Sequence, residues 1–200
     1  VTRSRDFAFV KPKVDLRYDV SPALQLRGTI ERIVNQLSFS DFVASNDQTD
    51  EDAETIAGNA DLRQQTQWKY SLNTEYRFPN DMGVINAELF YAAHQDVIDW
   101  IDVSTGPNNL RSTRGNIGDG VERVLNINAS VRAGFLGMPN LLLMPGLNLQ
   151  DSKVTDPFLG IERRFQNHAR GRFTFTFRHD LPQWNAFWGM QYFDRTDGNM

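Results

Sequence analysis

Residues 67–78 read QWKYSLNTEYRF, and this segment is the clearest indication of the fold that we expect. Its even-numbered positions are apolar or aromatic apart from Thr74, and its odd-numbered positions are all polar or charged. Because successive side chains of a β-strand point to opposite faces, this spacing predicts a strand with one apolar and one polar face. The stretch is about twice as long as the five or six residues of a usual strand in a soluble sheet.

The same period of two recurs in seven further segments of the chain. For example, Phe173, Phe175 and Phe177 alternate with threonine, and arginine flanks the run on both sides. No segment shows the spacing of an amphipathic helix. The expected strands occupy residues 14–20, 24–31, 67–78, 85–91, 125–135, 141–149, 172–178 and 184–192.

Short and long connections alternate between these expected strands. The short ones all contain proline, which presets a turn angle and cannot donate a hydrogen bond to a β-ladder. They are residues 21–23, 79–83, 136–140 and 180–183, and the long, polar connections are residues 35–66, 99–119 and 151–167. A barrel that crosses the outer membrane shows this asymmetry, with short turns in the periplasm and long loops outside.

Composition excludes several classes of protein. The chain of 200 residues has no cysteine, which excludes a disulfide scaffold, a thiolate zinc site and a cysteine nucleophile. Its net charge of −4 argues against a nucleic-acid partner, because such proteins bind mainly by neutralising phosphates. The sequence has no run of about 20 apolar residues for a membrane helix, but a barrel strand needs only alternate apolar positions.

We therefore expect an all-β protein: an antiparallel up-and-down meander of about eight long strands that is part of a transmembrane β-barrel, as a curved sheet or a partial barrel. One face of each strand would meet lipid and the other would line the lumen. Two alternatives remain open. The chain could be a stand-alone eight-stranded outer-membrane barrel with a structural or adhesion role, or a soluble all-β binding module.

Residues 58–76 resemble the barrel of TonB-dependent receptors, in which a Gly-Asn-Pro-x-Leu-x-Pro-Glu-Thr loop leads into a strand of Trp/Tyr-x-Glu-x-Gly-x-Glu-Tyr type. Ala60 and Gln64 replace the two prolines of that loop. Gln65 replaces its glutamate, and Asn73 replaces the glycine of the strand. The spacing of the motif is retained, although several of its residues differ.

Three further segments are similar to the same family, so the resemblance covers about residues 10–193. Residues 89–99 resemble a strand that runs out to an Asp-x-Ile at the loop edge, and residues 116–120 resemble an Asn-x-Gly-x-Gly/Ala entry to the next strand. Residues 24–42 resemble a family strand with its following loop.

The resemblance implies a barrel of about 22 strands around an internal plug domain. It implies import of a scarce nutrient, such as a siderophore, cobalamin, a carbohydrate or a peptide, across the outer membrane of a Gram-negative bacterium. The implied partners are outer-membrane lipid, the receptor's own plug domain, the inner-membrane TonB complex and a small nutrient ligand. It implies neither enzymatic activity nor a cofactor.

The connection pattern predicts that both ends of the chain lie outside the cell. A native barrel with an even number of strands normally has both termini in the periplasm. We therefore expect residues 1–200 to be a single barrel segment of a larger outer-membrane receptor, with no plug domain present.

Candidate ligand contacts lie in the connection at residues 99–119, where Trp100, Arg111 and Arg114 combine an aromatic ring with two cations. Outer loops select substrates, and aromatic and arginine side chains make compact binding surfaces. Charged side chains on the inward faces of the strands could guide a charged substrate, but we expect cross-strand ion pairs that fill the wall. They are Arg27, Lys69, Arg77, Arg132, Arg172 and Arg178 with Asp15, Asp19, Glu31, Glu75 and Glu88.

The remaining motifs predict no chemistry. The acidic run at residues 46–54 could collect calcium but lacks the spacing of an EF-hand, so we expect a solvated outer loop. His94, His168 and His179 have no metal-ligand spacing, and we expect no metal site. No nucleophile–base pair is recognisable, so we expect no catalysis.

Overall fold

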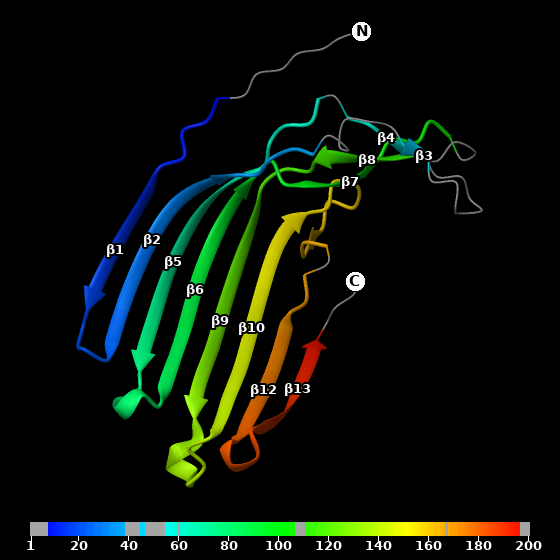
Figure 1. The fold of residues 1–200 in the computed structure, drawn as a ribbon. Helices are drawn as coiled ribbons and strands as arrows, with labels where there is room; N and C mark the ends of the chain where they lie inside the picture. The colour runs from blue at the N-terminus through cyan, green and yellow to red at the C-terminus, as the bar shows by residue number, and fades with distance from the viewer. Residues whose placement is uncertain are drawn as a thin grey trace.

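The computed structural model describes residues 8–38, 45–46, 55–59, 61–106, 111–166 and 168–196. Eight long antiparallel strands form one curved sheet in which each strand pairs with the next long strand along the chain (Figure 1). The predicted all-β meander of about eight strands is confirmed. The strands are β1 (Lys13–Asp19), β2 (Leu24–Val34), β5 (Thr66–Arg77), β6 (Gly83–Gln95), β9 (Gly120–Arg132), β10 (Leu141–Thr155), β12 (Gly171–Leu181) and β13 (Ala186–Thr196).

Seven of these strands have 11 to 15 residues, and all of them except β5 are longer than the segments that the sequence pattern marks. The apolar alternation predicts residues 85–91, whereas β6 runs over Gly83–Gln95. The outer end of β6 carries alanine, histidine and glutamine, whose side chains give no clear periodicity. Its backbone nevertheless continues the ladders with β5 and β9, because pairing depends on the neighbouring strand and not on side-chain polarity.

All four short turns lie where proline predicted them, at one end of the sheet. Asn80, Asp81 and Asn185 adopt positive φ values of 57°, 53° and 46° there, a conformation that short Asx side chains tolerate. Gly83 has a φ of 148°, and a Cβ at this position would lie 2.0 Å from the backbone oxygen of Ser130. The β5–β6 turn therefore requires glycine at position 83.

Helical structure in the described parts of the chain is confined to three 3-10 turns: residues Pro79–Asp81, Ala133–Leu136 and Pro182–Trp184. Within those parts, no helix has the length and apolarity needed to cross a membrane.

Pro145 lies inside β10 without a bulge. Its neighbour β9 pairs with Leu143 and again with Gly146 in the same register, and the ladder has no pair for residues 144 and 145. On the opposite side, β12 pairs with Pro145 directly through Phe175. The missing N–H of proline thus interrupts one ladder over two residues and leaves the register unchanged.

The two faces of the sheet differ in the way that a barrel wall requires. Leu16, Leu72 and Leu89 on one face are 71%, 49% and 56% exposed, so no second layer covers them. Ile127 and Phe175 on the same face are also not buried. The opposite face holds a hollow of about 530 Å³ lined almost entirely by polar and charged side chains.

A second sheet occupies the ends of two long connections. Its order is β3 (Ser45–Asn46), β4 (Thr55–Ala57), β8 (Arg111–Asn116) and β7 (Ile98–Asp102), with β4 parallel to β8. Figure 1 shows this outer sheet beyond the upper ends of the long strands. The sequence indicated only polar loops here. Strands of two to six residues that pair between separate connections leave no local periodicity to detect.

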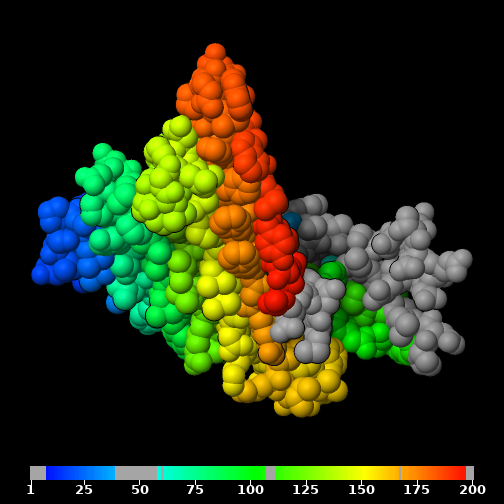
Figure 2. All heavy atoms as spheres, turned by 90° about the horizontal axis from the view of Figure 1, so that it is seen from below, coloured from blue at the N-terminus to red at the C-terminus, as the bar shows by residue number. Residues whose placement is uncertain are grey.

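The two edge strands of the main sheet, β1 and β13, have no pairing on their outer sides within the described ranges. Seen from the short-turn end, the strands follow one another from β1 in blue to β13 in red, and these two strands lie apart at opposite edges (Figure 2). In the meander, β1 begins and β13 ends on the side of the long connections. An edge of this length offers free backbone donors and acceptors to further strands.

Replacement of Phe175 by arginine tests which face of the sheet meets lipid. Phe175 lies mid-strand on the apolar face, between Pro145 and Tyr192, so Phe175→Arg should cost about 2–4 kcal/mol in a lipid-embedded barrel. The matched control is Thr174→Arg, which places the same cation on the polar face and should cost much less. Guanidinium unfolding in phospholipid vesicles, followed by tryptophan fluorescence, measures both. Equal losses at the two positions would contradict the assigned faces.

Candidate functional site

The buried apolar residues of the described chain gather mostly at one place, the outer end of the main sheet. Leu62 is fully buried, and Ala92, Val97, Val124 and Val154 are at most 6% exposed. They lie where the connections β2–β5, β6–β9 and β10–β12 meet the outer ends of the strands. We call this region, residues 58–66, 92–124 and 150–170 as far as they are described, the outer mouth.

Trp100 and Arg114 form a pair on the outer sheet. They are direct cross-strand partners of β7 and β8, and the guanidinium carbon of Arg114 lies 5.3 Å from the centre of the Trp100 ring. This distance is that of a cation–π contact. Trp100 is 38% exposed, so part of the ring stays available to a ligand.

Arg111 lies away from Trp100 and Arg114. It begins β8 and pairs with Thr55 of β4, and its position three residues before Arg114 places it on the opposite face of the strand. Its backbone N–H donates to the hydroxyl of Ser104 at 2.9 Å. Of the three predicted ligand contacts, the structure unites two and separates the third.

Asn116 fastens the β2–β5 connection to β8. Its side-chain amide accepts the backbone N–H of Arg63 at 2.8 Å and donates to the carbonyls of Arg63 and Asp96 at 2.9 Å each. The Arg63 guanidinium also binds the Asp96 carboxylate. Asn59 donates to the carbonyl of Arg114 at 2.9 Å, which fixes the backbone of the candidate site directly.

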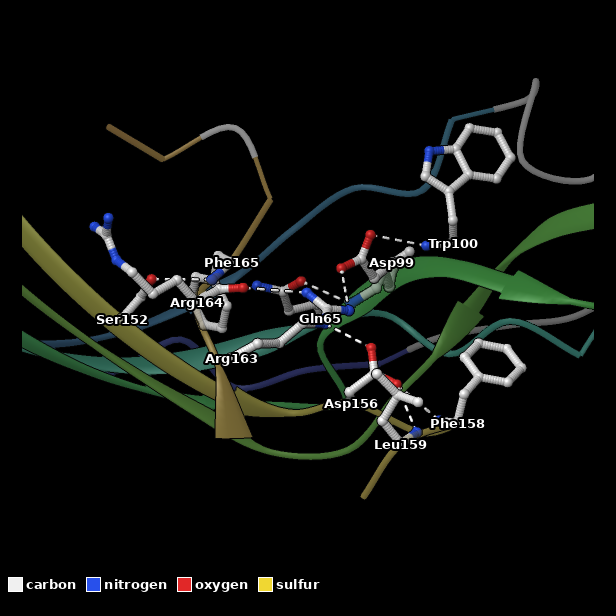
Figure 3. Close-up of polar contacts among 11 residues, drawn as sticks. Gln65, Asp99, Trp100, Ser152, Asp156, Phe158, Leu159, Arg163, Arg164 and Phe165 are labelled. Atoms are coloured by element: carbon white, nitrogen blue, oxygen red, sulfur yellow. Dashed lines mark hydrogen bonds and ion pairs between the residues drawn. The ribbon is translucent and has the colours of Figure 1, made fainter. Parts of the chain in front are cut away.

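Arg163 fastens the β10–β12 connection to β7 (Figure 3). It lies in the two-residue strand β11 (Glu162–Arg163), which pairs with the outer end of β10. Its Nη2 donates to Asp99 Oδ2 at 3.0 Å, and its Nε donates to Asp156 Oδ2 at 2.8 Å. Asp99 in turn accepts the backbone N–H of Trp100 at 2.8 Å, so the contacts of Arg163 extend to the candidate site. We call the ion pairs of Arg163 with Asp99 and Asp156 the Arg163 bridge.

The Asp156 carboxylate is held in its charged form. It accepts the backbone N–H of Leu159, the Arg163 guanidinium and the backbone N–H of Phe158, and these donors keep its pKa below the ordinary value of 3.8. Both backbone bonds are 2.9 Å long. They close a turn at whose tip Phe158 and Leu159 are 58% and 71% exposed.

A second set of contacts joins the same three connections through two histidines. Gln65 Oε1 accepts the backbone N–H of Ile98 at 3.1 Å, so its amide nitrogen donates to His94 Nδ1 at 2.9 Å. The ring proton of His94 is then on Nε2, which faces Glu122 at 3.5 Å. His168 Nδ1 lies 3.4 Å from the other oxygen of Glu122.

The ring of Phe165 lies edge-on to both histidines, with ring centres 5.1 Å and 5.6 Å apart. Sequence reasoning missed this cluster, because its members come from the ends of β6 and β9 and from the β2–β5 and β10–β12 connections, and they share no spacing. The described residues contain no group of three or more His, Asp or Glu side chains arranged to hold a metal ion.

The polar face of the main sheet is cross-linked along its strands. Lys69 pairs with Glu88 at 3.0 Å, Asn126 donates to Glu88 at 3.1 Å, and Asn148 donates to Asn126 at 2.6 Å. One chain of contacts thus crosses β5, β6, β9 and β10. These bonds support the interpretation of the inward charges as wall-filling pairs.

The acidic run at residues 46–54 lies outside the described residues apart from the strand backbone at Asn46. His179 pairs with Trp188 on the apolar face, at 3.3 Å from the indole nitrogen, and lies far from the outer mouth near the end of β12.

Residues 1–199 match the model of the family described as TonB dependent receptor-like, beta-barrel. The chain belongs to this family. No curated protein sequence matches it.

Solved structures of three bacterial receptors share the fold at low sequence identity. The siderophore receptor PirA of Pseudomonas aeruginosa is 14% identical with a TM-score of 0.59, over 90% of this chain and 34% of that one. The alcaligin outer membrane receptor FauA of Bordetella pertussis is 15% identical with a TM-score of 0.57, over 93% and 29%.

A variant of the ferric enterobactin receptor PfeA of Pseudomonas aeruginosa in complex with enterobactin is 15% identical with a TM-score of 0.58, over 84% of this chain and 25% of that one. The chain therefore spans about a quarter to a third of the length of these receptors.

Removal of the Arg163 side chain tests whether the Arg163 bridge holds the β10–β12 connection against β7. Arg163→Ala leaves the carboxylates of Asp99 and Asp156 without their shared cation and should lower the free energy of local opening by about 1–3 kcal/mol. The control is Lys153→Ala, whose exposed pair with Glu162 should contribute less than about 0.5 kcal/mol. Hydrogen exchange of β7 and residues 156–165 measures both. If hydrogen exchange in Arg163→Ala matches that of the control, the Arg163 bridge does not hold this connection.

The turn at Asp156 should depend on pH. Because its folded pKa is lowered, the carboxylate contributes stability that is fully present above its ordinary value of 3.8 and is lost as pH falls through the folded value. Amide exchange at Phe158 and Leu159, corrected for intrinsic rates, should stay slow down to about pH 4 and rise below it. Asp156→Asn should remove this pH step. A step that persists in that variant would exclude Asp156 as its source.

Proposed function

We propose that this chain is part of the wall and outer mouth of an outer-membrane receptor that imports a scarce nutrient into a Gram-negative bacterium. The observation that carries the proposal is the contrast between the faces of the main sheet: exposed apolar side chains on one face and a polar, ion-paired hollow on the other. Lipid covers the first face and water fills the second. The match to the barrel family supports the same function.

Residues 1–200 act as one barrel segment of this larger receptor. Further strands pair with the free edges of β1 and β13, a plug domain lies inside the barrel, and the inner-membrane TonB complex drives import. The protein is a transporter and not an enzyme, in keeping with its structural neighbours, which are receptors.

The imported ligand is a ferric siderophore. One structural neighbour is a siderophore receptor by name, another is an alcaligin outer membrane receptor, and a third is a ferric enterobactin receptor in complex with enterobactin. Trp100 and Arg114 contact the ligand, since the ring offers a flat apolar surface and the guanidinium a cation for anionic iron-chelating groups. Arg111, on the opposite face of β8, contributes at most to the surrounding charge.

Neither alternative explains the structure as well. A stand-alone eight-stranded barrel needs a ladder between β1 and β13, and the described strands form none. A soluble binding module needs a layer that covers the apolar face, where Leu16, Leu72 and Leu89 are about half exposed or more.

Ligand binding by the whole receptor tests the proposal. Ferric enterobactin, ferric alcaligin and cobalamin are added to cells that express it, and binding and uptake are measured with and without a functional TonB complex. We expect binding of a ferric siderophore in both strains and uptake only in the first. Trp100→Ala and Arg114→Ala should each weaken binding about tenfold, or about 1.4 kcal/mol, whereas Arg77→Ala at the short-turn end should not. Uptake of cobalamin alone, or of none of the three, would overturn the siderophore assignment.

A further inference from the structure

Two of the four short turns carry large apolar side chains that the described residues leave uncovered. The β9–β10 turn, residues 133–140, contains no charged residue. Its Phe135, Leu136 and Met138 are 64%, 62% and 49% exposed. Trp184 of the β12–β13 turn is 71% exposed. We call these four exposed side chains the apolar rim.

The two turns are neighbours at the short-turn end of the sheet. The backbone N–H of Asp180 donates to the carbonyl of Asn140 at 3.0 Å, which joins the base of one turn to the other. Seen from the short-turn end, the β9–β10 turn in yellow-green lies beside the β12–β13 turn in orange (Figure 2). The β5–β6 turn is different, because its 3-10 segment consists of Pro79, Asn80 and Asp81. This end of the sheet is therefore apolar in one part and polar in another.

The apolar rim continues the face of the sheet that meets lipid. Trp188 of β13 and His179 of β12 are cross-strand partners on that face, and the indole N–H donates to His179 Nδ1 at 3.3 Å. The Trp188 ring lies edge-on to Phe177, with ring centres 4.9 Å apart. An indole that packs on an apolar ring and binds a polar group is typical of the boundary between hydrocarbon and headgroups. The row of Trp188 and His179 thus marks this boundary.

The apolar rim lies close beyond this boundary. The β12–β13 ladder continues for only two further residue pairs, which end at Leu181 and Ala186. Two residues of strand add about 7 Å, and less along the membrane normal because barrel strands are tilted. The headgroup layer on each side of a bilayer is about 5–7 Å thick. In β10, Leu141 pairs with His179 in the boundary row itself, and the β9–β10 turn ends directly before it. Both turns therefore fall at the depth of the headgroups.

Immersion at this depth suits the composition of the two turns. Exposed in water, four large apolar side chains would form an unfavourable surface, and the boundary between headgroups and acyl chains removes them from water. The turns carry part of their own backbone hydrogen bonds, from the N–H groups of Gly137, Met138 and Asn185 to carbonyls within the same turn. Headgroups and their water can bind the remaining backbone groups, which hydrocarbon could not.

We propose that the apolar rim is immersed in the inner leaflet of the outer membrane, at the boundary between phospholipid headgroups and acyl chains, while the β5–β6 turn projects into periplasmic water. The phospholipid surface is the partner because the apolar rim is continuous with the lipid face and lies within a headgroup layer of the Trp188 row. The proposal rests on the membrane setting of the proposed function. It adds that two turns, and not only the strands, hold the receptor in the membrane on one side.

Single cysteines in the whole receptor test the immersion. This chain has no cysteine, so each substitution gives one labelling site once any cysteine elsewhere in the receptor is replaced. Leu136→Cys reports on the apolar rim. Pro79→Cys is the control in the β5–β6 turn, and both side chains are exposed, so neither change removes a buried contact. Each variant carries the environment-sensitive fluorophore NBD and is placed in nanodiscs of phosphatidylethanolamine and phosphatidylglycerol, which leave both membrane surfaces open to water.

We expect NBD at position 136 to emit at shorter wavelength than NBD at position 79. A lipid with a nitroxide next to its headgroup should quench the label at position 136 several-fold more strongly, and iodide, which stays in water, should show the opposite order. Similar emission and similar iodide quenching at the two positions would place the apolar rim in water and overturn the proposal. Emission at short wavelength without quenching by either agent would also overturn it, because a protein surface would then be the cover.

The result does not depend on the transported ligand. If the quenching contrast appears and siderophore uptake fails, the ligand assignment is wrong and the contact of the apolar rim with lipid stands. If uptake succeeds and the contrast is absent, the import function stands and the immersion is wrong. A receptor that does not enter nanodiscs would contradict both the membrane setting and the immersion.

Discussion

Backbone hydrogen bonding between neighbouring strands is the constraint on which the rest of this structure depends. Seven consecutive antiparallel ladders join β1 to β13. Hydrocarbon offers no hydrogen bonds to the backbone, so a strand in lipid must pair with its neighbours. The ladders fix the register, and the register sends every second side chain to the same face. Pro145 illustrates the strength of this constraint, because the missing donor interrupts one ladder and the register continues unchanged.

The outer mouth is held by a different kind of interaction. Its connections have a few buried apolar residues beneath them, but they are joined to one another mainly by side chains that bind backbone groups or opposite charges. Asn116 binds backbone atoms on two connections, and Arg163 binds two carboxylates. Such contacts are directional, so they fix the position of β7 and β8 without the extensive core that a separate domain would need.

Hydrogen bonds from the strand ends and the neighbouring connections hold the candidate ligand contacts in place. Trp100 is tied through Asp99 to Arg163, and Ile98 is tied through Gln65 to His94 at the end of β6. Arg114 is held by Asn59 from a third connection. A binding residue on a short strand can keep a defined orientation only when its neighbours are fixed in this way, and here three separate parts of the chain contribute.

The long strands, the short turns and the two faces of the sheet could be predicted from the sequence, because the period of two and the proline turns are local properties of the chain. The alternation alone predicts that one apolar face carries Phe173, Phe175 and Phe177, without knowledge of the neighbouring strands. The sequence also singled out Trp100 and Arg114 by residue type, and the motif at residues 58–76 by resemblance.

Other features could be seen only in the folded chain. Trp100 and Arg114 are in contact, whereas Arg111 lies on the opposite face of β8. His94 and His168 share Glu122, and Arg163 joins two connections. These contacts join segments up to 64 residues apart, as between Arg163 and Asp99. No local spacing encodes them, because they depend on the ladders that place the outer ends of the strands side by side.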